Sequence, residues 1–80
     1  MSARAEINKK NNAFRSELRA AMERQGIHNW RDLIRRWGLS QATGYSRIRQ
    51  PETITVRELR VLVAILRMDE ESKARLAATL

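Results

Sequence analysis

The sequence contains no cysteine, one proline and only three glycines among its 80 residues. Without cysteine the chain has neither a disulfide framework nor thiolate ligands for a metal, and it suits a reducing cytoplasm. So few proline and glycine residues cannot supply the many turns of an all-β fold. The longest apolar run, Val61 to Leu66, is far shorter than the roughly 20 residues of a membrane span. We therefore expect one small all-α domain without a membrane segment.

The chain also has few of the residues that enzymes use. It has a single histidine, His28, no cysteine nucleophile and no pair of carboxylates with an apparent catalytic partner. No acidic residue stands at ligand spacing from His28, so the simple interpretation is a loop histidine and not a metal ligand. We expect no enzymatic activity, no metal, no cofactor and no small-molecule ligand.

The net positive charge is confined to the first fifty residues. Residues 1–50 carry eleven Lys and Arg against four acids, which equals the charge of +7 of the whole chain, and residues 51–80 hold five of each sign. Basic residues that neutralise phosphates release counterions, which favours gathering them on one surface. Most of them are Arg, whose guanidinium can bind a phosphate or a guanine edge with two hydrogen bonds. This distribution predicts a nucleic-acid-binding surface.

Apolar residues recur at helical spacing in five segments. Asn29, Ser40, Thr55 and Asp69 are suitable N-caps, and Gly38 is suited to end the second helix. The predicted helices span residues 12–25, 30–37, 41–49, 56–67 and 70–79. The fourth is apolar over more than half of its circumference, so we expect it to be the most buried.

The first eleven residues contain no large apolar residue apart from Met1 and Ile7. We predict that residues 1–11 form a flexible basic arm and that residues 12–80 form the folded domain. The arm carries Arg4, Lys9 and Lys10, which could contact nucleic acid, although a terminus without a role fits the same residues.

The third predicted helix has apolar residues three positions apart, at Ala42, Tyr45 and Ile48. We predict that these residues form its inward face, which leaves a polar outer face. The connection to the second helix is only residues 38–40, and such a pair of short helices indicates a helix-turn-helix unit whose second helix enters the major groove.

Residues 29–66 resemble the helix-turn-helix domains of Cro and phage repressors. The stretch Leu-Ile-Arg-Arg-Trp-Gly-Leu-Ser at residues 33–40 is similar to the second helix and turn of that family, with Gly38 at the turn glycine. Gln-Ala-Thr at residues 41–43 matches the start of its recognition helix, and residues 51–66 look like its loop and fourth helix. The resemblance implies a compact five-helix, lambda-repressor-like domain that binds specific duplex DNA, usually as a symmetric dimer.

The sequence departs from that family at three positions. The family usually has Ala where Ile34 stands, and it has apolar residues six and nine positions after the turn glycine, where this chain has Gly44 and Arg47. These departures bear on which side chains of the third helix point outward.

The helix-turn-helix interpretation assigns candidate roles to residues on both sides of the turn. The residues predicted to read bases are Gln41, Thr43, Ser46 and Arg47. The residues predicted to bind phosphates are Asn29, Arg31, Arg35, Arg36, Ser40 and Arg49. The residues predicted to form a dimer contact on the fifth helix are Leu76, Ala77 and Leu80.

From the sequence we therefore expect a transcriptional regulator that binds a palindromic operator in double-stranded DNA as a homodimer. Its small size and the lack of a sensor domain favour a phage or mobile-element origin, in the cytoplasm or nucleoid of a bacterial host. One alternative stays open, in which the same fold serves as a protein-interaction module or inhibitor whose basic face binds an acidic protein.

Overall fold

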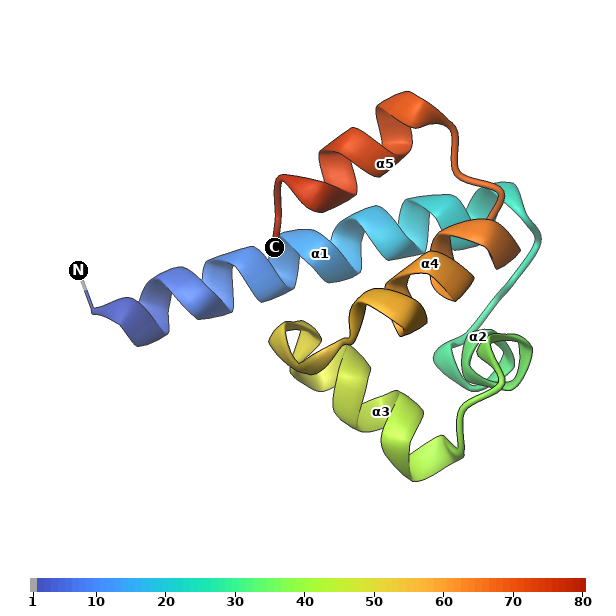
Figure 1. Cartoon of the computed structure of the whole chain (residues 1–80), viewed down its shortest axis with the longest axis horizontal. Helices are drawn as coiled ribbons and strands as arrows, with labels where there is room; N and C mark the ends of the chain where they lie inside the picture. The colour runs from blue at the N-terminus through green and yellow to red at the C-terminus, as the bar shows by residue number, and fades with distance from the viewer. Residues whose placement is uncertain (1) are drawn as a thin grey trace.

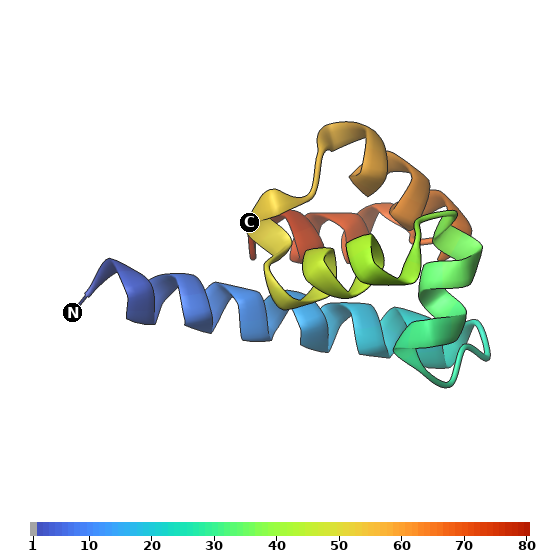
Figure 2. The ribbon, with the colours of Figure 1, turned by 90° about the horizontal axis from the view of Figure 1, so that it is seen from below.

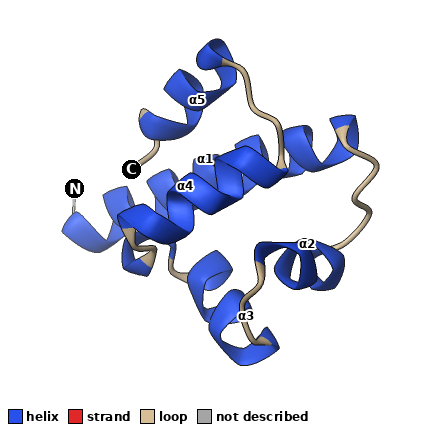
Figure 3. Cartoon of the chain, turned by 45° about the vertical axis from the view of Figure 1, so that its right-hand side comes forward, coloured by secondary structure: helices blue, strands red, loops and turns tan. Residues whose placement is uncertain are grey.

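A computed structural model describes residues 2–80, which form helices and no strand (Figures 1 and 3). The predicted all-α class with five helices is confirmed, and the predicted bounds of the second and third helices agree with the structure. The helices are α1 (Ala3–Arg24), α2 (Trp30–Trp37), α3 (Gln41–Arg49), the short 3-10 helix η1 (Pro51–Thr53), α4 (Val56–Ile65) and α5 (Glu70–Ala77). In Figure 1, α1 runs along the molecule with α5 above it, α4 in front and α2 and α3 below.

Helix α1 is longer than predicted. It begins at Ala3, where the Ser2 hydroxyl accepts a hydrogen bond from the Ala5 N–H at 3.2 Å, and it continues without a break into the packed half of the helix. The prediction of a flexible arm over residues 1–11 is therefore wrong for residues 3–11, and Met1 lies outside the described residues. Polar composition indicated exposure correctly, because residues 2–10 are all exposed, but exposure does not require disorder.

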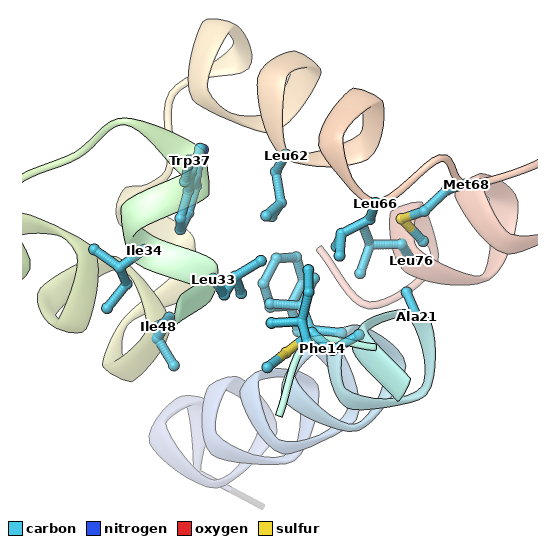
Figure 4. Packing of buried hydrophobic residues seen from close by; sticks show 13 residues of the cluster. Phe14, Ala21, Leu33, Ile34, Trp37, Ile48, Leu62, Leu66, Met68 and Leu76 are labelled. Atoms are coloured by element: carbon cyan, nitrogen blue, oxygen red, sulfur yellow. The ribbon is translucent and has the colours of Figure 1, made fainter. Parts of the chain in front are cut away.

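The core is formed by apolar side chains from all five α-helices (Figure 4). The largest fully buried side chains are Phe14, Leu18, Leu33, Ile34, Leu62, Leu66 and Leu76. Helix α3 contributes mainly Ile48, which is 5% exposed. Each such side chain contributes about 2 kcal/mol of burial free energy, most of which offsets the entropy lost on folding.

Helix α4 is less buried than its sequence predicts. Leu62 is its one fully buried residue, whereas Val56 is 65% and Val61 39% exposed. The helix lies on the outside of the bundle, so only one side of it meets the core (Figure 1). The prediction that it is the most buried helix is wrong, and its outer side is left apolar and basic.

Glu58 connects three helices at the side of the bundle. Its carboxylate Oε1 accepts hydrogen bonds from the Thr55 N–H and from Arg47 Nε, both at 2.9 Å. The Thr55 hydroxyl accepts in return from the Glu58 N–H, which completes the capping box of α4. The backbone oxygen of Glu58 accepts from Trp37 Nε1 at 2.9 Å. One residue thus joins α4 to α2 and α3.

The stability of the domain should depend on pH through Glu58. The Thr55 N–H first, and then the Arg47 guanidinium, hold the pKa of the Glu58 carboxyl below its ordinary value. Because the folded pKa is lowered, this stabilisation is present above the unfolded pKa of about 4.3 and is lost as the pH falls through the folded pKa. We expect Glu58→Gln to cost about 1–2 kcal/mol at pH 7 and to flatten the fall in Tm between about pH 5 and 3.

Circular dichroism melting curves across this pH range test the expectation. The matched control is Glu23→Gln, since Glu23 is exposed and forms no ion pair within residues 2–80. The control should keep the wild-type pH profile. A Glu58→Gln profile identical to that of the control would contradict the assigned role.

Candidate nucleic-acid interface

The predicted turn between α2 and α3 is present with each cap in its expected place. Asn29 begins α2, where its Oδ1 accepts a hydrogen bond from the Asp32 N–H at 2.8 Å. Gly38 ends α2 with a φ of 81°, a left-handed conformation that glycine adopts without strain. Ser40 begins α3, and its Oγ accepts from the Thr43 N–H at 3.2 Å. The start of α3 is thereby fixed three residues after the end of α2.

The contact between Ile34 and Gly44 sets the rotation of α3 about its axis. Ile34 of α2 is fully buried and lies against Gly44, which has no side chain. A Cβ atom on Gly44 would lie 2.6 Å from Ile34 Cγ1 and still closer to Cγ2, so no larger residue fits there unless Ile34 moves. Position 44 therefore faces inward.

This rotation brings a different set of side chains to the surface than predicted. Ala42 is exposed and Tyr45 is 40% exposed, so only Ile48 of the predicted inward face points into the core. The prediction for Ala42 and Tyr45 is wrong because apolar spacing alone cannot reveal a glycine that packs directly on a neighbouring helix.

Three of the four residues predicted to read bases, Gln41, Thr43 and Ser46, differ in exposure and in their contacts. Gln41 is exposed at the start of α3, and Ser46 is half-buried on the same outer face. Thr43 is engaged at the helix start, where its Oγ1 accepts from Ser40 Oγ at 3.0 Å. Tyr45 was not predicted as a site residue, but it is exposed one helical turn after Gln41.

The prediction that Arg47 points outward is wrong. Its Nε donates to Glu58 Oε1 at 2.9 Å, and the two side chains are only 26% and 17% exposed. Arg47 follows Gly44 by three positions, so the rotation that turns Gly44 toward α2 turns Arg47 toward α4. Its charge is used to hold α3 and α4 together.

Four of the six predicted phosphate-binding residues lie on α2 or at its cap, with Asn29 and Arg31 at its start and Arg35 and Arg36 in its last turn. A surface hollow of about 650 Å³ brings Asn29, Arg31 and Arg35 together with Gln41 of α3. Arg31 is exposed and forms no ion pair within residues 2–80, and Ser40 and Arg49 are exposed on the α3 side. We call the surface made by these residues and the outer side of α3 the α2–α3 face; its members are Asn29, Arg31, Arg35, Ser40, Gln41, Ala42, Tyr45, Ser46 and Arg49.

Asp32 moderates the positive charge beside this face. Its carboxylate accepts from Arg35 at 2.6 Å and pairs with Arg36 at 3.4 Å. The hydrogen bond from Arg35 is the main reason that the pKa of Asp32 lies below its ordinary value. The Arg35 side chain is nevertheless 79% exposed and the Arg36 side chain 49%. The Arg35 side chain thus keeps most of its surface open to a ligand, and the Arg36 side chain about half.

Two arginines of α1 serve the domain itself. Arg15 Nη1 donates to the backbone oxygens of Ile48 and Arg49 at 3.0 and 3.1 Å, which satisfies carbonyls at the end of α3. The Arg19 guanidinium lies over the Trp30 ring, 5.2 Å from its centroid. Neither role was predicted, because both depend on contacts between residues distant in the sequence.

The remaining predicted site residues lie elsewhere. Arg4, Lys9 and Lys10 are exposed on the amino-terminal part of α1, and none of them lines the hollow beside α2 and α3. Leu76 is 1% exposed, so its prediction as a dimer contact is wrong: it fills the core beneath α5. Ala77 and Leu80 are exposed.

Residues 2–80 contain no group of three or more acidic, histidine or cysteine side chains placed to hold a metal ion. None of the helices in this range combines the length and the apolar character needed to cross a membrane. Comparisons with protein-family models, with curated proteins and with solved structures find no match to the chain.

The Ile34–Gly44 contact can be tested by exchanging the sizes of its two residues. We expect Gly44→Val alone to destabilise the domain by about 1–3 kcal/mol through overpacking. Ile34→Ala alone should cost about 2–5 kcal/mol through the cavity that it leaves. The double variant should cost clearly less than the sum, because the new valine fills the space vacated by Ile34.

Urea unfolding of the four proteins measures this coupling. Ala42→Val on the exposed side of α3 is the matched control for helix propensity and should cost less than about 1 kcal/mol. Additive costs in the double variant would show that residues 34 and 44 do not share one space.

Proposed function

We propose that this chain is a transcriptional regulator that binds duplex DNA through the α2–α3 face. The observation that carries the proposal is the exposed outer side of α3, which places hydrogen-bonding side chains next to unpaired or partly paired arginines of α2. A helix of nine residues is about 13 Å long, and a single helix fits the major groove of B-form DNA.

The exposed side chains of α3 have the chemistry of base readers. The Gln41 amide can donate to and accept from an adenine edge, and the Tyr45 ring can contact a thymine methyl group while its hydroxyl bonds a base or phosphate. Ala42 is small and apolar, which allows close approach of the helix to the base edges. Ser46 and Arg49 extend the same outer side toward the end of the helix.

The groups at the start of α2 are of the kinds that bind a phosphate. The free N–H groups of its first turn, after the Asn29 cap, carry the positive end of the helix dipole. Arg31, Arg35 and Arg36 add guanidiniums beside it, which position a backbone without reading sequence. Occupancy would follow protein concentration and the pairing of two copies on a palindromic operator in a bacterial cytoplasm, as expected of a phage or mobile-element regulator.

An acidic protein partner is the second candidate, favoured by the outer side of α4. Val56 and Val61 are exposed there beside Arg57 and Arg60, so apolar and basic groups are interleaved away from α3. Such a surface suits an acidic protein with apolar contacts. The two candidates use different faces and can therefore be separated by mutation.

Duplex binding should weaken with salt in proportion to the phosphates contacted. Four basic residues, Arg31, Arg35, Arg36 and Arg49, give an expected slope of about −3.5 for log K against log salt per bound copy. Fluorescence anisotropy with a duplex selected from random sequence measures the slope. A slope near zero would contradict a phosphate-binding role for these residues.

Substitutions on α3 and α2 should have different effects on specificity. We expect Gln41→Ala or Tyr45→Ala to weaken the selected duplex by about 1–3 kcal/mol and random duplex much less, because only base contacts carry sequence information. Arg31→Ala should weaken both duplexes alike and reduce the salt slope by about 1.

Arg60→Ala on α4 is the matched control, since it removes an exposed charge from another face. DNA binding should tolerate this change. Loss of binding with Arg60→Ala and no effect of Gln41→Ala and Tyr45→Ala would place the ligand on α4.

A further inference from the structure

The amino-terminal part of α1 extends beyond the rest of the molecule (Figures 1 and 2). Residues 3–10 are helical, and every one of them is exposed. Ser2 caps its first turn, and six of its eight residues, Ala3, Arg4, Ala5, Glu6, Lys9 and Lys10, favour helix intrinsically, so the segment is helical although it buries no side against the core.

An open hollow lies where this segment leaves the body. Its volume is about 410 Å³, and its apolar lining comes from Ile7, Pro51, Ile54 and Leu80. Ile7 is 46% and Leu80 50% exposed, so this end of the molecule carries two exposed large apolar side chains. Ile7 lies on the same side of α1 as the core residues Phe14 and Leu18. No other helix within residues 2–80 covers that side at residue 7, so Ile7 stays exposed.

We propose that a second copy of this chain covers the hollow, with the two α1 segments crossing antiparallel at Ile7 around a two-fold axis. Ile7 both projects from the surface and borders the hollow, so each copy offers one apolar side chain and one space to receive it. When a two-fold axis relates the two copies, Ile7 of each copy enters the hollow of the other. A partner without this symmetry would fill only one of the two hollows. The pairing needs no DNA.

The charges around the hollow are complementary under this pairing. Where antiparallel helices cross at residue 7, residue 4 of one copy lies opposite residues 10 and 11 of the other. Glu52 is there, since its Oε2 accepts from Asn11 Nδ2 at 2.8 Å, and neither Glu52 nor Arg4 forms an ion pair within residues 2–80 of its own copy. Arg4 of each copy thus meets Glu52 of the other. Lys10 also lines the hollow, where its Nζ donates to the Leu80 backbone oxygen at 3.4 Å.

The pairing also gives a separation suited to DNA, a step that rests on the proposed function. Ile7 and Arg15 are about 12 Å apart along α1, and Arg15 holds the carboxyl end of α3, from which α3 runs obliquely away from α1 (Figure 1). The centre of α3 is then on the order of 15–20 Å from the axis, so two copies of α3 are on the order of 30–40 Å apart. One turn of DNA is about 34 Å.

Single cysteines test the pairing directly, because the natural chain has none. We expect Ile7→Cys, oxidised without DNA, to form a disulfide-linked dimer on a non-reducing gel at least tenfold faster than two matched controls. The controls are Val61→Cys on α4 and Ala77→Cys on α5, which are also exposed. Faster cross-linking at Val61 or Ala77 than at Ile7 would overturn the proposal.

A charge exchange on surface residues gives a second test that leaves the core intact. Sedimentation equilibrium without DNA should show a weak dimer whose Kd rises at least fivefold in Arg4→Glu and in Glu52→Arg, and returns toward the wild-type value when both changes are combined. A wild-type chain that stays monomeric at millimolar concentration would overturn the pairing. A dimer of this kind that binds no duplex would support the pairing and contradict the proposed function.

Discussion

The contact of Ile34 with Gly44 is the constraint on which the rest of the interface depends. Ile34 is fully buried, and its branched side chain occupies the space that a side chain at position 44 would need. Helix α3 has few other buried residues, so this contact and Ile48 decide how the helix is turned. The same rotation exposes Tyr45 and directs Arg47 to Glu58. The identity of the outward side chains is therefore decided by a residue on the preceding helix.

The basic residues near α3 divide into two groups with different physical roles. Arg15 and Arg47 hold α3 from either side, one through its terminal carbonyls and the other through the carboxylate of Glu58. Arg31, Arg35 and Arg49 keep their guanidiniums exposed near the outer side of α3. Net charge thus overstates the charge open to a ligand. The positive charge of the first fifty residues is also not gathered on one surface, because three more basic residues lie on the amino-terminal part of α1: Arg4, Lys9 and Lys10.

Features set by local interactions were predictable from the sequence. Asn29, Gly38 and Ser40 act on their own neighbours in the chain, and the bounds of α2 and α3 follow from them. Features set by contacts between distant residues were not. Leu76 was predicted to lie at the surface of a short helix, but it is buried in the core. Tyr45 was predicted to face the core, but it is exposed, and Gly44 faces the core instead. Residues 3–11 were predicted to be flexible, but they are helical. A polar composition indicates that a segment is exposed to solvent, and it does not indicate whether the segment is ordered.

The α2–α3 face is tested most directly by amide chemical shifts of the labelled chain during titration with a selected duplex. We expect the largest changes at Gln41, Ala42 and Tyr45, with a second group in the first turn of α2 around Arg31. Changes that fade as salt is added would match a surface that binds phosphates. The largest changes on α4 between Val56 and Val61, with α3 unaffected, would contradict the account.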